Sequence, residues 1–499
     1  MRKKLGILVL VATSGALGSL GACSSSTPTA GPDASVDAGG GSDAATGVDA
    51  ALAVSCNDAI EAVYGDPGAL AGDRGAILKC ATDRVWTRDE LEAAARKSDY
   101  PYTGKPFTSG AKVFRVTFRT ERGTTPPTPG YSSSLVFMPD APTPGAPAVV
   151  AAHGTTGPAA SCAPSRYTFT STANAFLSMV FPLVGAGYPV IAPDYAGYAN
   201  YGAPGNPPSG YFASEDVGKS VLDGLRALRK LAPGAVSDKN IVVGHSQGGH
   251  AALSALALSE TYGVPLSGVV AYAPVWFNQA IYGAAFLLAD QFPLDTSPFL
   301  NATGLWYLYS HGELLDGQGK GGDIYVPAKR AAVKEFFDTA CIGDADKIKP
   351  LGKLMTDLYT TEFIDSVKLA AAGVTDCGPT NEICKKWLAR YAADRPHLTG
   401  RAATVPVLVP YGSKDETLTS DRAVCGFDRL RSDNAAYKVC LTKDASHSGV
   451  VGMRSGYVND WIANVALGAP APPACDQDEK ALVDDAGAPV KCASPPPNN

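Results

Sequence analysis

The sequence predicts an α/β fold, a mostly parallel, doubly wound sheet with a helical cap inserted between two of its strands. Apolar runs of strand length alternate with helix-like segments between residues 146 and 275, which is typical of parallel strands joined by helices. The alternation stops near Trp276, and about 130 largely helix-like residues follow before a strand pattern resumes at residues 405–410. Because this insertion is far longer than a connecting loop, we expect it to cover the carboxyl edge of the sheet, where such sheets bind ligands.

The expected elements follow one another in the order that this fold needs. Early elements are a helix at residues 89–97, strands at 112–119, 133–137 and 146–153, a helix at 174–184 and a strand at 187–194. A loop rich in Gly, Pro and Tyr at 196–210 leads to a helix that starts near Ser214, the expected N-cap, and ends before Pro233. Later strands are predicted at 241–243, 267–275, 405–410 and 436–441, and cap helices at 331–337 and 382–393.

Length and composition bound the class of protein. With 45% hydrophobic and 18% charged residues, the 499-residue chain can bury a large core and is not disordered as a whole. Its formal net charge of −6 argues against nucleic acid as a partner, because binding to phosphates needs a basic surface. We therefore expect a globular protein with no nucleic-acid partner.

The amino terminus has the features of a signal peptide, residues 1–22. A basic start at residues 2–4 is followed by an apolar run that begins at Leu5. Leu-Gly-Ala before Cys23 resembles the lipobox of bacterial lipoproteins, in which the cysteine is lipidated; cleavage nearby with Cys23 unmodified is the alternative. No later apolar run reaches the ~18 residues of a membrane-spanning helix, so the expected anchor is lipid only.

The segments that flank the predicted domain are low in apolar residues or rich in proline. Residues 23–53 are rich in Ala, Gly, Asp, Ser and Thr and predict a flexible acidic linker. The Pro-rich tail, residues 469–499, is expected to lie on the surface, held by a disulfide. We expect an exported protein, either secreted or attached to the bacterial cell envelope, at the outer membrane because Ser24 rather than Asp follows Cys23.

Gly244-His-Ser-Gln-Gly248 fits the pattern G-x-S-x-G, in which a serine stands at a sharp turn between a strand and a helix. An apolar run precedes the pattern and an apolar helical segment, residues 251–258, follows it, which is the context that the turn needs. Glycines are expected on both sides because a Cβ there would collide with the strand or the helix. A plain Gly-Ser turn before a helix is the alternative. The pattern predicts Ser246 as a catalytic nucleophile.

The acid and the histidine of such a site follow the serine in chain order. Among six histidines, His447 is the one that follows the resumed sheet, in a loop after the last strand, and we predict it as the general base. Asp415 lies in the loop after the preceding strand and is predicted to orient the imidazole. Glu416 and Asp421 are nearby alternatives for the acid.

Stabilisation of the oxyanion needs two backbone N–H groups directed at the developing negative charge. One is expected from Gln247, the residue after the nucleophile. The other is expected from Thr155, in the His-Gly loop after the strand at 146–153. A simple glycine turn is the alternative for that loop.

Five stretches carry a family resemblance: His153-Gly-Thr-Thr-Gly157, Cys162-Ala-Pro-Ser165, Tyr188-Pro-Val-Ile-Ala-Pro-Asp194, Gly244-His-Ser-Gln-Gly-Gly-His250, and Pro406-Val-Leu-Val with Gly412 and Asp415. They resemble the bacterial secretory lipase family, which is related to fungal lipases of the lipase A type, and the resemblance covers residues 55–467. It implies an α/β-hydrolase core, an inserted helical lid, no cofactor, and hydrolysis of carboxylic esters including acylglycerols. The anchor, the linker and the cysteine-bearing tail depart from the family and leave open whether the substrate is a free lipid or an ester at the cell surface.

The chain has 11 cysteines, and lipidation of Cys23 would leave ten, enough for five disulfides in an exported protein. Four pairs are neighbours in sequence: Cys56/Cys80, Cys377/Cys384, Cys425/Cys440 and Cys475/Cys492. By elimination, Cys162 is expected to pair with Cys341 and so to tie the cap to the catalytic floor. Metal binding is the competing use, but no C-x-x-C occurs and no His lies at ligand spacing from these cysteines, so no metal site is expected.

The predicted domain order is a signal peptide (1–22), a linker (23–53), the first part of the core (54–275), the cap (276–402), the second part of the core (403–468) and the tail (469–499). We predict a serine hydrolase of carboxylic esters, a lipase or esterase, that forms an acyl-enzyme with an ester or lipid substrate.

Two alternatives stay open. The first is a serine peptidase on the same fold, which would need paired acids in its cap to act on free N-termini; Glu313, Glu335 and Glu362 are available, but none stands in a paired motif. The second is a non-catalytic binding module at the cell surface. It predicts the loss of a member of the triad, and none is lost.

Overall fold

The computed structural model describes residues 52–70, 72–167, 169, 175–198, 206–276, 286, 289–291, 293–371, 377–484 and 486–492. The predicted signal peptide, Cys23 and nearly all of the predicted linker lie outside these residues. All described residues belong to one unit, which spans residues 45–499.

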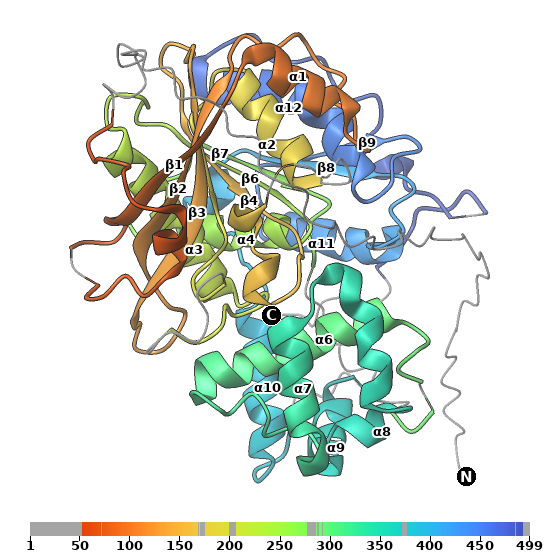
Figure 1. Cartoon of the computed structure of the whole chain (residues 1–499). Helices are drawn as coiled ribbons and strands as arrows, with labels where there is room; N and C mark the ends of the chain where they lie inside the picture. Colours follow the sequence, from red (N-terminus) through yellow and green to blue (C-terminus); the bar gives the residue numbers. More distant parts are fainter. Residues whose placement is uncertain are drawn as a thin grey trace, which may run out of the picture. The chain divides into compact units, whose positions relative to one another are not determined.

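One sheet organises the described residues (Figure 1). Its nine strands, in spatial order, are β1 (Ile77–Trp86), β2 (Ala111–Glu121), β3 (Pro129–Pro139), β5 (Val190–Pro193), β4 (Ala148–Ala152), β6 (Asn240–His245), β7 (Gly268–Tyr272), β8 (Val407–Gly412) and β9 (Tyr437–Thr442). Strands β1, β2 and β3 pair antiparallel, and so do β3 and β5, whereas the strands from β5 to β9 are parallel. The predicted, mostly parallel sheet is confirmed.

Helices on both faces of the sheet explain the apolar runs of its central strands. β4, β6 and β7 are buried at every position, as expected of parallel strands that are covered on both sides. α3 (Ser214–Leu231) packs against α4 (Gln247–Leu258) on one face, and α2 (Ala175–Gly185) packs against α12 (Gly449–Leu467) on the other (Figure 1). α1 (Arg88–Lys97) packs on α2, and α11 (Ser420–Ser432) connects β8 to β9. The doubly wound arrangement is therefore confirmed.

Two elements differ from the sequence prediction. β1 was not expected, because Lys79, Asp83 and Arg84 interrupt its apolar pattern; it lies at the edge of the sheet, where polar side chains are tolerated. Ser214 is the first residue of α3 and not its N-cap. The Ser214 backbone N–H donates instead to Asp394 Oδ1 (3.0 Å), so a carboxylate from far along the chain takes the capping role.

The segment between β7 and β8, here called the cap segment (residues 276–402), is helical over most of its described part. The α-helices of that described part are α6 (Pro298–His311), α7 (Arg330–Thr339), α8 (Met355–Leu358), α9 (Thr361–Ala371) and α10 (Glu382–Ala393). They share a hydrophobic cluster that contains Trp306, Phe337 and Trp387, and that also takes in Tyr211 and Phe212 from the loop before α3. Figure 1 shows these helices grouped apart from the sheet, so the cap segment has a core of its own.

Five disulfides join the ten cysteines that follow Cys23. The predicted pairs Cys56–Cys80, Cys377–Cys384 and Cys162–Cys341 are confirmed. The predicted pairs Cys425/Cys440 and Cys475/Cys492 are wrong, because the bonds are Cys425–Cys492 and Cys440–Cys475.

The path of the tail explains the exchanged partners. Leu441, in β9, donates its backbone N–H to the carbonyl of Gln477 (3.0 Å), so the tail lies along β9. This contact brings the Cα atom of Cys475 to 5.5 Å from that of Cys440, well within the range for a disulfide. Neighbours in sequence are therefore not neighbours in space here, because the tail folds back over the last strand.

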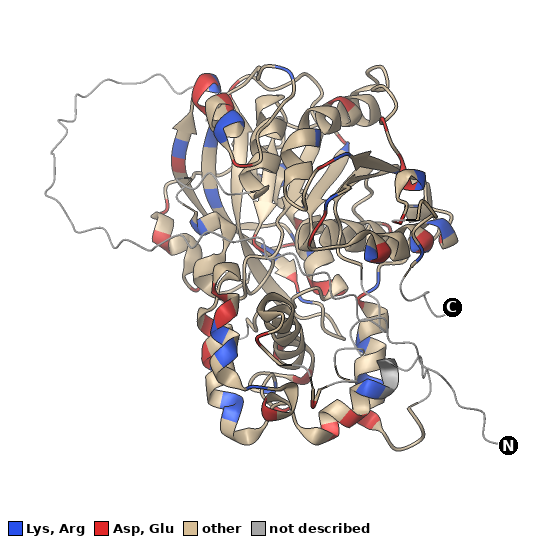
Figure 2. Cartoon of the chain, turned by 90° about the vertical axis from the view of Figure 1, so that its right-hand side faces the viewer, with Lys and Arg blue, Asp and Glu red and all other residues tan. Residues whose placement is uncertain are grey.

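Lys and Arg residues are interspersed with Asp and Glu residues along several helices in Figure 2. In the part of the chain that the structure describes, no helix combines the length and the apolar character that crossing a bilayer requires.

Candidate active site

Ser246 stands at the turn between β6 and α4, as the sequence predicts. Its backbone has φ 57° and ψ −115°, a conformation that is uncommon for residues with a side chain and that stores strain. Two bonds to the neighbouring strand end hold the turn: Ser246 N–H donates to Tyr272 O (2.9 Å), and Val275 N–H donates to Ser246 O (3.2 Å). The serine is thus fixed at the carboxyl end of two adjacent parallel strands.

Close backbone contacts explain the glycines on either side of the serine. A Cβ on Gly244 would collide with the carbonyl oxygen of Gly248, and a Cβ on Gly248 would collide with that of Ala152 in β4. Both clashes are with backbone atoms, which cannot move aside without shifting a strand. The reason that the sequence suggests for these glycines is confirmed.

His447 and Asp415 meet at the same edge of the sheet, in the loops after β9 and β8. His447 Nδ1–H donates to Asp415 Oδ2 (2.8 Å), and both residues are buried. The other carboxylate oxygen, Oδ1, accepts the backbone N–H groups of Thr417 (3.0 Å) and Leu418 (2.7 Å). These bonds fix the carboxylate in one orientation, and the carboxylate fixes the imidazole.

The other ring nitrogen of His447, Nε2, is buried and has no hydrogen-bond partner among the described residues. Because Nδ1 carries the proton that Asp415 accepts, Nε2 is left as the basic nitrogen. A buried polar atom without a partner requires an explanation, and a catalytic role is one such explanation.

His245 joins the serine turn to the His447 loop. Its Nε2–H donates to the His447 carbonyl (3.0 Å), and the centres of the two rings are 4.8 Å apart. Burial lowers the pKa of His245 to about 3, so this ring is neutral at ordinary pH. Since Ser246 is the next residue, His447 is held beside the serine; a bond between Ser246 Oγ and His447 Nε2 is not among the hydrogen bonds of the described residues.

The two alternative acids have other surroundings. Glu416 is exposed and accepts the backbone N–H of His447 with Oε2 (3.1 Å), whereas Asp421 lies in the first turn of α11. Of the three carboxylates, Asp415 is the one that contacts the imidazole.

The loop from His153 to Gly157 lies against Ser246, since a Cβ on Gly154 would be 3.5 Å from Ser246 Cβ. Four of its carbonyls are occupied as acceptors: His153 O by Tyr195 OH (2.9 Å), Gly154 O by His153 Nδ1–H (2.6 Å), Thr156 O by Ile342 N–H (2.8 Å) and Gly157 O by Tyr198 OH. Fixing these carbonyls fixes the planes of the peptides, and with them the directions of the N–H groups. The predicted donor Thr155 is part of this loop, and Gln247 is the first residue of α4, whose N–H has no partner within the helix.

Tyrosine hydroxyls hold the loop through its two threonines, which the sequence does not reveal. Tyr211 OH lies 2.7 Å from Thr155 Oγ1, and Tyr198 OH lies 2.7 Å from Thr156 Oγ1. Burial raises the pKa of both tyrosines well above the ordinary value, so both hydroxyls stay neutral. The abundance of tyrosine between residues 188 and 211 is the signal that could have pointed to them.

The cap segment reaches this loop directly. Cys162, five residues after Gly157, is bonded to Cys341, and the next residue, Ile342, donates its N–H to Thr156 O (2.8 Å). A covalent bond and a backbone hydrogen bond therefore tie the cap segment to the predicted oxyanion loop.

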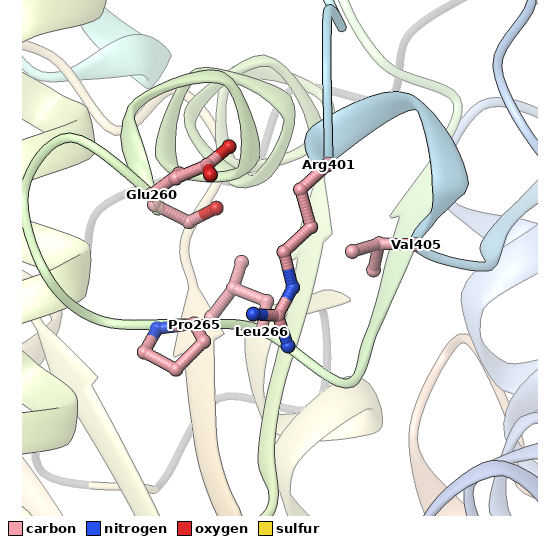
Figure 3. A pocket seen from close by; sticks show the side chains of 6 residues that line it. Glu260, Pro265, Leu266, Arg401 and Val405 are labelled. Atoms are coloured by element: carbon pink, nitrogen blue, oxygen red, sulfur yellow. The ribbon is translucent and has the colours of Figure 1, made fainter.

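A small cavity of about 140 Å³ lies near the other end of the serine helix, lined by Ser259, Glu260, Pro265, Leu266, Arg401 and Val405. Figure 3 shows the Arg401 side chain extending through it towards Pro265 and Leu266. α4 separates Ser259 from Ser246 by roughly 20 Å, so this cavity is remote from the serine. Within the described ranges, no group of three or more His, Cys, Asp or Glu side chains is arranged to hold a metal ion.

Comparisons with known proteins agree on the fold. A model of the alpha/beta hydrolase family matches residues 149–454, and no match was found among curated proteins. Among solved structures, a Legionella pneumophila protein matches with a TM-score of 0.61 and 16% identity, over 78% of this chain and 98% of its own.

Two further solved structures are similar. The rice cell wall degrading esterase LipA from Xanthomonas oryzae matches with a TM-score of 0.59 and 15% identity, over 80% of this chain and 99% of its own. Candida antarctica lipase A in its closed state matches with a TM-score of 0.53 and 15% identity, over 85% of this chain and 86% of its own. The family match spans more than half of the sequence and includes the serine turn, Asp415 and His447, so the chain belongs to the alpha/beta hydrolase family.

Proposed function

We propose that this chain is a serine hydrolase of carboxylic esters, a lipase or esterase with Ser246, His447 and Asp415 as its triad. The observation that carries the proposal is the buried, partnerless Nε2 of His447, on a ring whose Nδ1–H is held by Asp415 and whose backbone is bonded to the neighbour of a strained serine. This is the constellation that nucleophilic catalysis needs.

In the proposed reaction, Ser246 Oγ attacks the ester carbonyl while its proton passes to His447 Nε2. The backbone N–H groups of Gln247 and Thr155 stabilise the oxyanion of the tetrahedral intermediate. When that intermediate collapses, the bond to the alcohol breaks and His447 gives its proton to the leaving oxygen, which leaves an acyl-enzyme on Ser246. Water, deprotonated by His447, then attacks the acyl-enzyme, and the carboxylic acid is released with Ser246 restored.

Asp415 has a positioning and electrostatic role in this reaction. It holds the imidazole with the proton on Nδ1, and it stabilises the imidazolium that forms when Nε2 takes the proton from Ser246. Its own two bonds to Thr417 and Leu418 keep it in place through both steps.

An ester substrate is favoured over an amide by two observations. Two of the similar structures are named an esterase and a lipase, although their likeness extends to the fold alone. The acids that a peptidase for free N-termini would use are also not paired: Glu313 accepts the N–H groups of Gly319 and Gly321, and Glu335 and Glu362 are exposed on separate helices.

The proposal extends to the place of action. Ten paired cysteines suit an exported protein, because disulfides persist in oxidising compartments. We propose that the cap segment covers the serine, and that Cys23 carries a lipid that anchors the enzyme at the bacterial cell envelope, at the outer membrane, with residues 23–53 as its tether.

The test is a panel of substrates given to the wild type and to Ser246→Ala. We expect hydrolysis of nitrophenyl esters of short and long acids, weak or no cleavage of aminoacyl anilides, and loss of the ester activity in Ser246→Ala. Preference for the anilides would favour the peptidase, and no turnover of either class would favour the binding module.

A further inference from the structure

A second Asp–His pair lies inside the cap segment, at the ends of two of its helices. His311 is the last residue of α6, and Asp394 is the C-cap of α10. His311 Nε2 is 2.8 Å from Asp394 Oδ2, and Tyr307 OH donates to the same oxygen (2.6 Å). His311 is 0% exposed and Asp394 is 5% exposed, so the pair is shielded from water.

Both ring nitrogens of His311 have partners. Its Nδ1 is 2.7 Å from the carbonyl oxygen of Tyr307, which can only accept, so Nδ1 donates to it. Nε2 faces the carboxylate of Asp394. The ring therefore connects the end of α6 to the end of α10.

The same aspartate binds both core helices next to the active site. Asp394 Oδ1 accepts the N–H of Ser214, the first residue of α3, where a carboxylate complements the helix dipole. The backbone carbonyl of Asp394 accepts Nε2–H of His250 (2.8 Å), one turn after Ser246 in α4. His250 in turn donates its backbone N–H to Ser246 O (3.1 Å). Two hydrogen bonds, both made by His250, therefore connect Asp394 of the cap segment to the predicted nucleophile.

Tyr211 connects α6 to the predicted oxyanion loop in a similar way. Ser310, the neighbour of His311, accepts the N–H of Tyr211 with its hydroxyl (3.0 Å). Tyr211 OH is paired with Thr155, and its ring packs edge-on against Trp306 of the cap segment, with ring centres 6.2 Å apart. A shift of α6 would therefore move the residue that holds Thr155.

We infer that Asp394, together with His311, is a positioning residue that seats the cap segment on α3 and α4 beside the active site. The inference rests on the proposed function for its kinetic part. The expected consequence is selective. Turnover of esters whose acyl chain extends under the cap segment depends on this positioning, whereas turnover of acetate esters depends on it little.

The experiment compares Asp394→Asn, His311→Gln and the double variant with a matched control, Asp316→Asn. Asp316 also binds α10, through Lys386 and Arg390, but both of these partners lie within the cap segment. We expect each single variant to lose about 10- to 100-fold in kcat on a long-chain nitrophenyl ester and less than about threefold on the acetate, because small displacements cost orders of magnitude in positioning. The double variant should recover much of the loss, since two amides can donate and accept across the same gap.

The ratio of long-chain to acetate turnover separates positioning from plain stability. This ratio should fall in each single variant, recover in the double variant and keep its wild-type value in the control. Equal losses on both esters, a control that behaves like Asp394→Asn, or no recovery in the double variant would each overturn the inference.

A readout without turnover keeps the test independent of the proposed function. Hydrogen exchange of the Ser214 amide should accelerate in Asp394→Asn and His311→Gln, and stay at the wild-type rate in Asp316→Asn. If the wild type hydrolyses no ester while exchange responds in this way, the proposed function is refuted but the positioning role of Asp394 and His311 is supported. If exchange does not change, the positioning role is refuted whatever the activity.

Discussion

The Asp415–His447 pair of the core and the Asp394–His311 pair of the cap segment have the same 2.8 Å contact between ring nitrogen and carboxylate, but they differ at the second nitrogen. In His447 the second nitrogen is buried and has no partner among the described residues, whereas in His311 it is bonded to the Tyr307 carbonyl. A spare nitrogen can take a proton from a substrate or a serine, and a bonded one cannot. The distance within the Asp–His pair is therefore the same in both, and the surroundings of the second nitrogen are what differ.

The carboxylates differ in the same sense. Asp415 is held by two backbone N–H groups from its own loop, two and three residues away. The carboxylate of Asp394 is held by groups from α3 and α6, and its backbone carbonyl by His250 of α4. The partners that hold Asp415 come from its own loop. The partners of Asp394 come from segments far apart in the sequence, and the aspartate joins these segments.

The largest expected effect comes from removing the serine or the histidine of the predicted triad. Ser246→Ala and His447→Ala should each lower kcat by on the order of 10⁶-fold, because the members of a triad act as a unit. His311→Gln should lower it far less, although its ring sits at the same distance from an aspartate. Turnover of nitrophenyl acetate, normalised to folded protein, measures this. Similar losses in His447→Ala and His311→Gln would show that the two Asp–His pairs do not differ in role.

The acid is the next effect in size. Asp415→Asn should cost about 10⁴-fold in kcat, since an amide mis-sets the tautomer and leaves the nucleophile in place. Glu416→Gln should cost little, because an amide oxygen still accepts the N–H of His447. If Glu416→Gln proves the more damaging change, the acid has been misassigned.

Removing the disulfide tests the covalent link between cap segment and oxyanion loop. Cys162–Cys341 joins residues 179 apart in sequence, and a loop of that size is nominally worth ~4–5 kcal/mol. We expect Cys162→Ser/Cys341→Ser to fold at moderate temperature and to lose up to about 10²-fold on bulky acyl esters, and less on acetate, because positioning of the loop suffers most. Equal losses on both esters would contradict this, and mapping of non-reduced peptides verifies the bond in the wild type.

Low pH should destabilise the folded core through protonation of His245. Its folded pKa of about 3 lies below the ordinary value of about 6.5, so the stability from the neutral ring is complete above about pH 6.5 and is lost as the pH falls towards 3. The loss amounts to about 1.4 kcal/mol per pH unit. His245→Gln, which can still donate to His447 O, should flatten the acid limb of the unfolding free energy by that slope in urea titrations; an unchanged slope would show that His245 is already charged or exposed.

The smallest expected effect on activity is that of the anchor. Cys23→Ser should release the protein from the membrane fraction with its specific activity unchanged, because a tether of about 30 residues lets the domain turn freely. Cell fractionation and an ester assay measure both. A variant still bound to membranes would refute the lipid anchor, and a changed specific activity would show that the tether takes part in the fold.

Features that depend on short stretches were predictable from the sequence. Ser246 needs two glycines, a strand and a helix within twenty residues, and His447 and Asp415 follow from chain order and the ends of two strands. Asp394, by contrast, is a loop residue like many others in the sequence. Its role comes from Ser214 and His250, which lie 180 and 144 residues away, and no local pattern carries that information.

The errors have the same origin. Ser214 looks like an N-cap because serine often caps helices, but Asp394 takes the capping contact from a distance. Cys425 and Cys440 look like partners because they are close in sequence, but the returning tail separates them. Proximity along the chain fails wherever a later segment folds back over an earlier one.

The returning tail has a consequence for association between copies of the protein. β9 is the last strand of the sheet, and an open edge strand offers backbone groups to any other strand. Cys440–Cys475 and the bond from Leu441 N–H to Gln477 O place part of the tail along β9, and Cys425–Cys492 fastens it to α11. We therefore expect the tail to hinder strand-to-strand aggregation, and a chain cut after Gly468 would leave Cys440 in β9 and Cys425 in α11 without their disulfide partners.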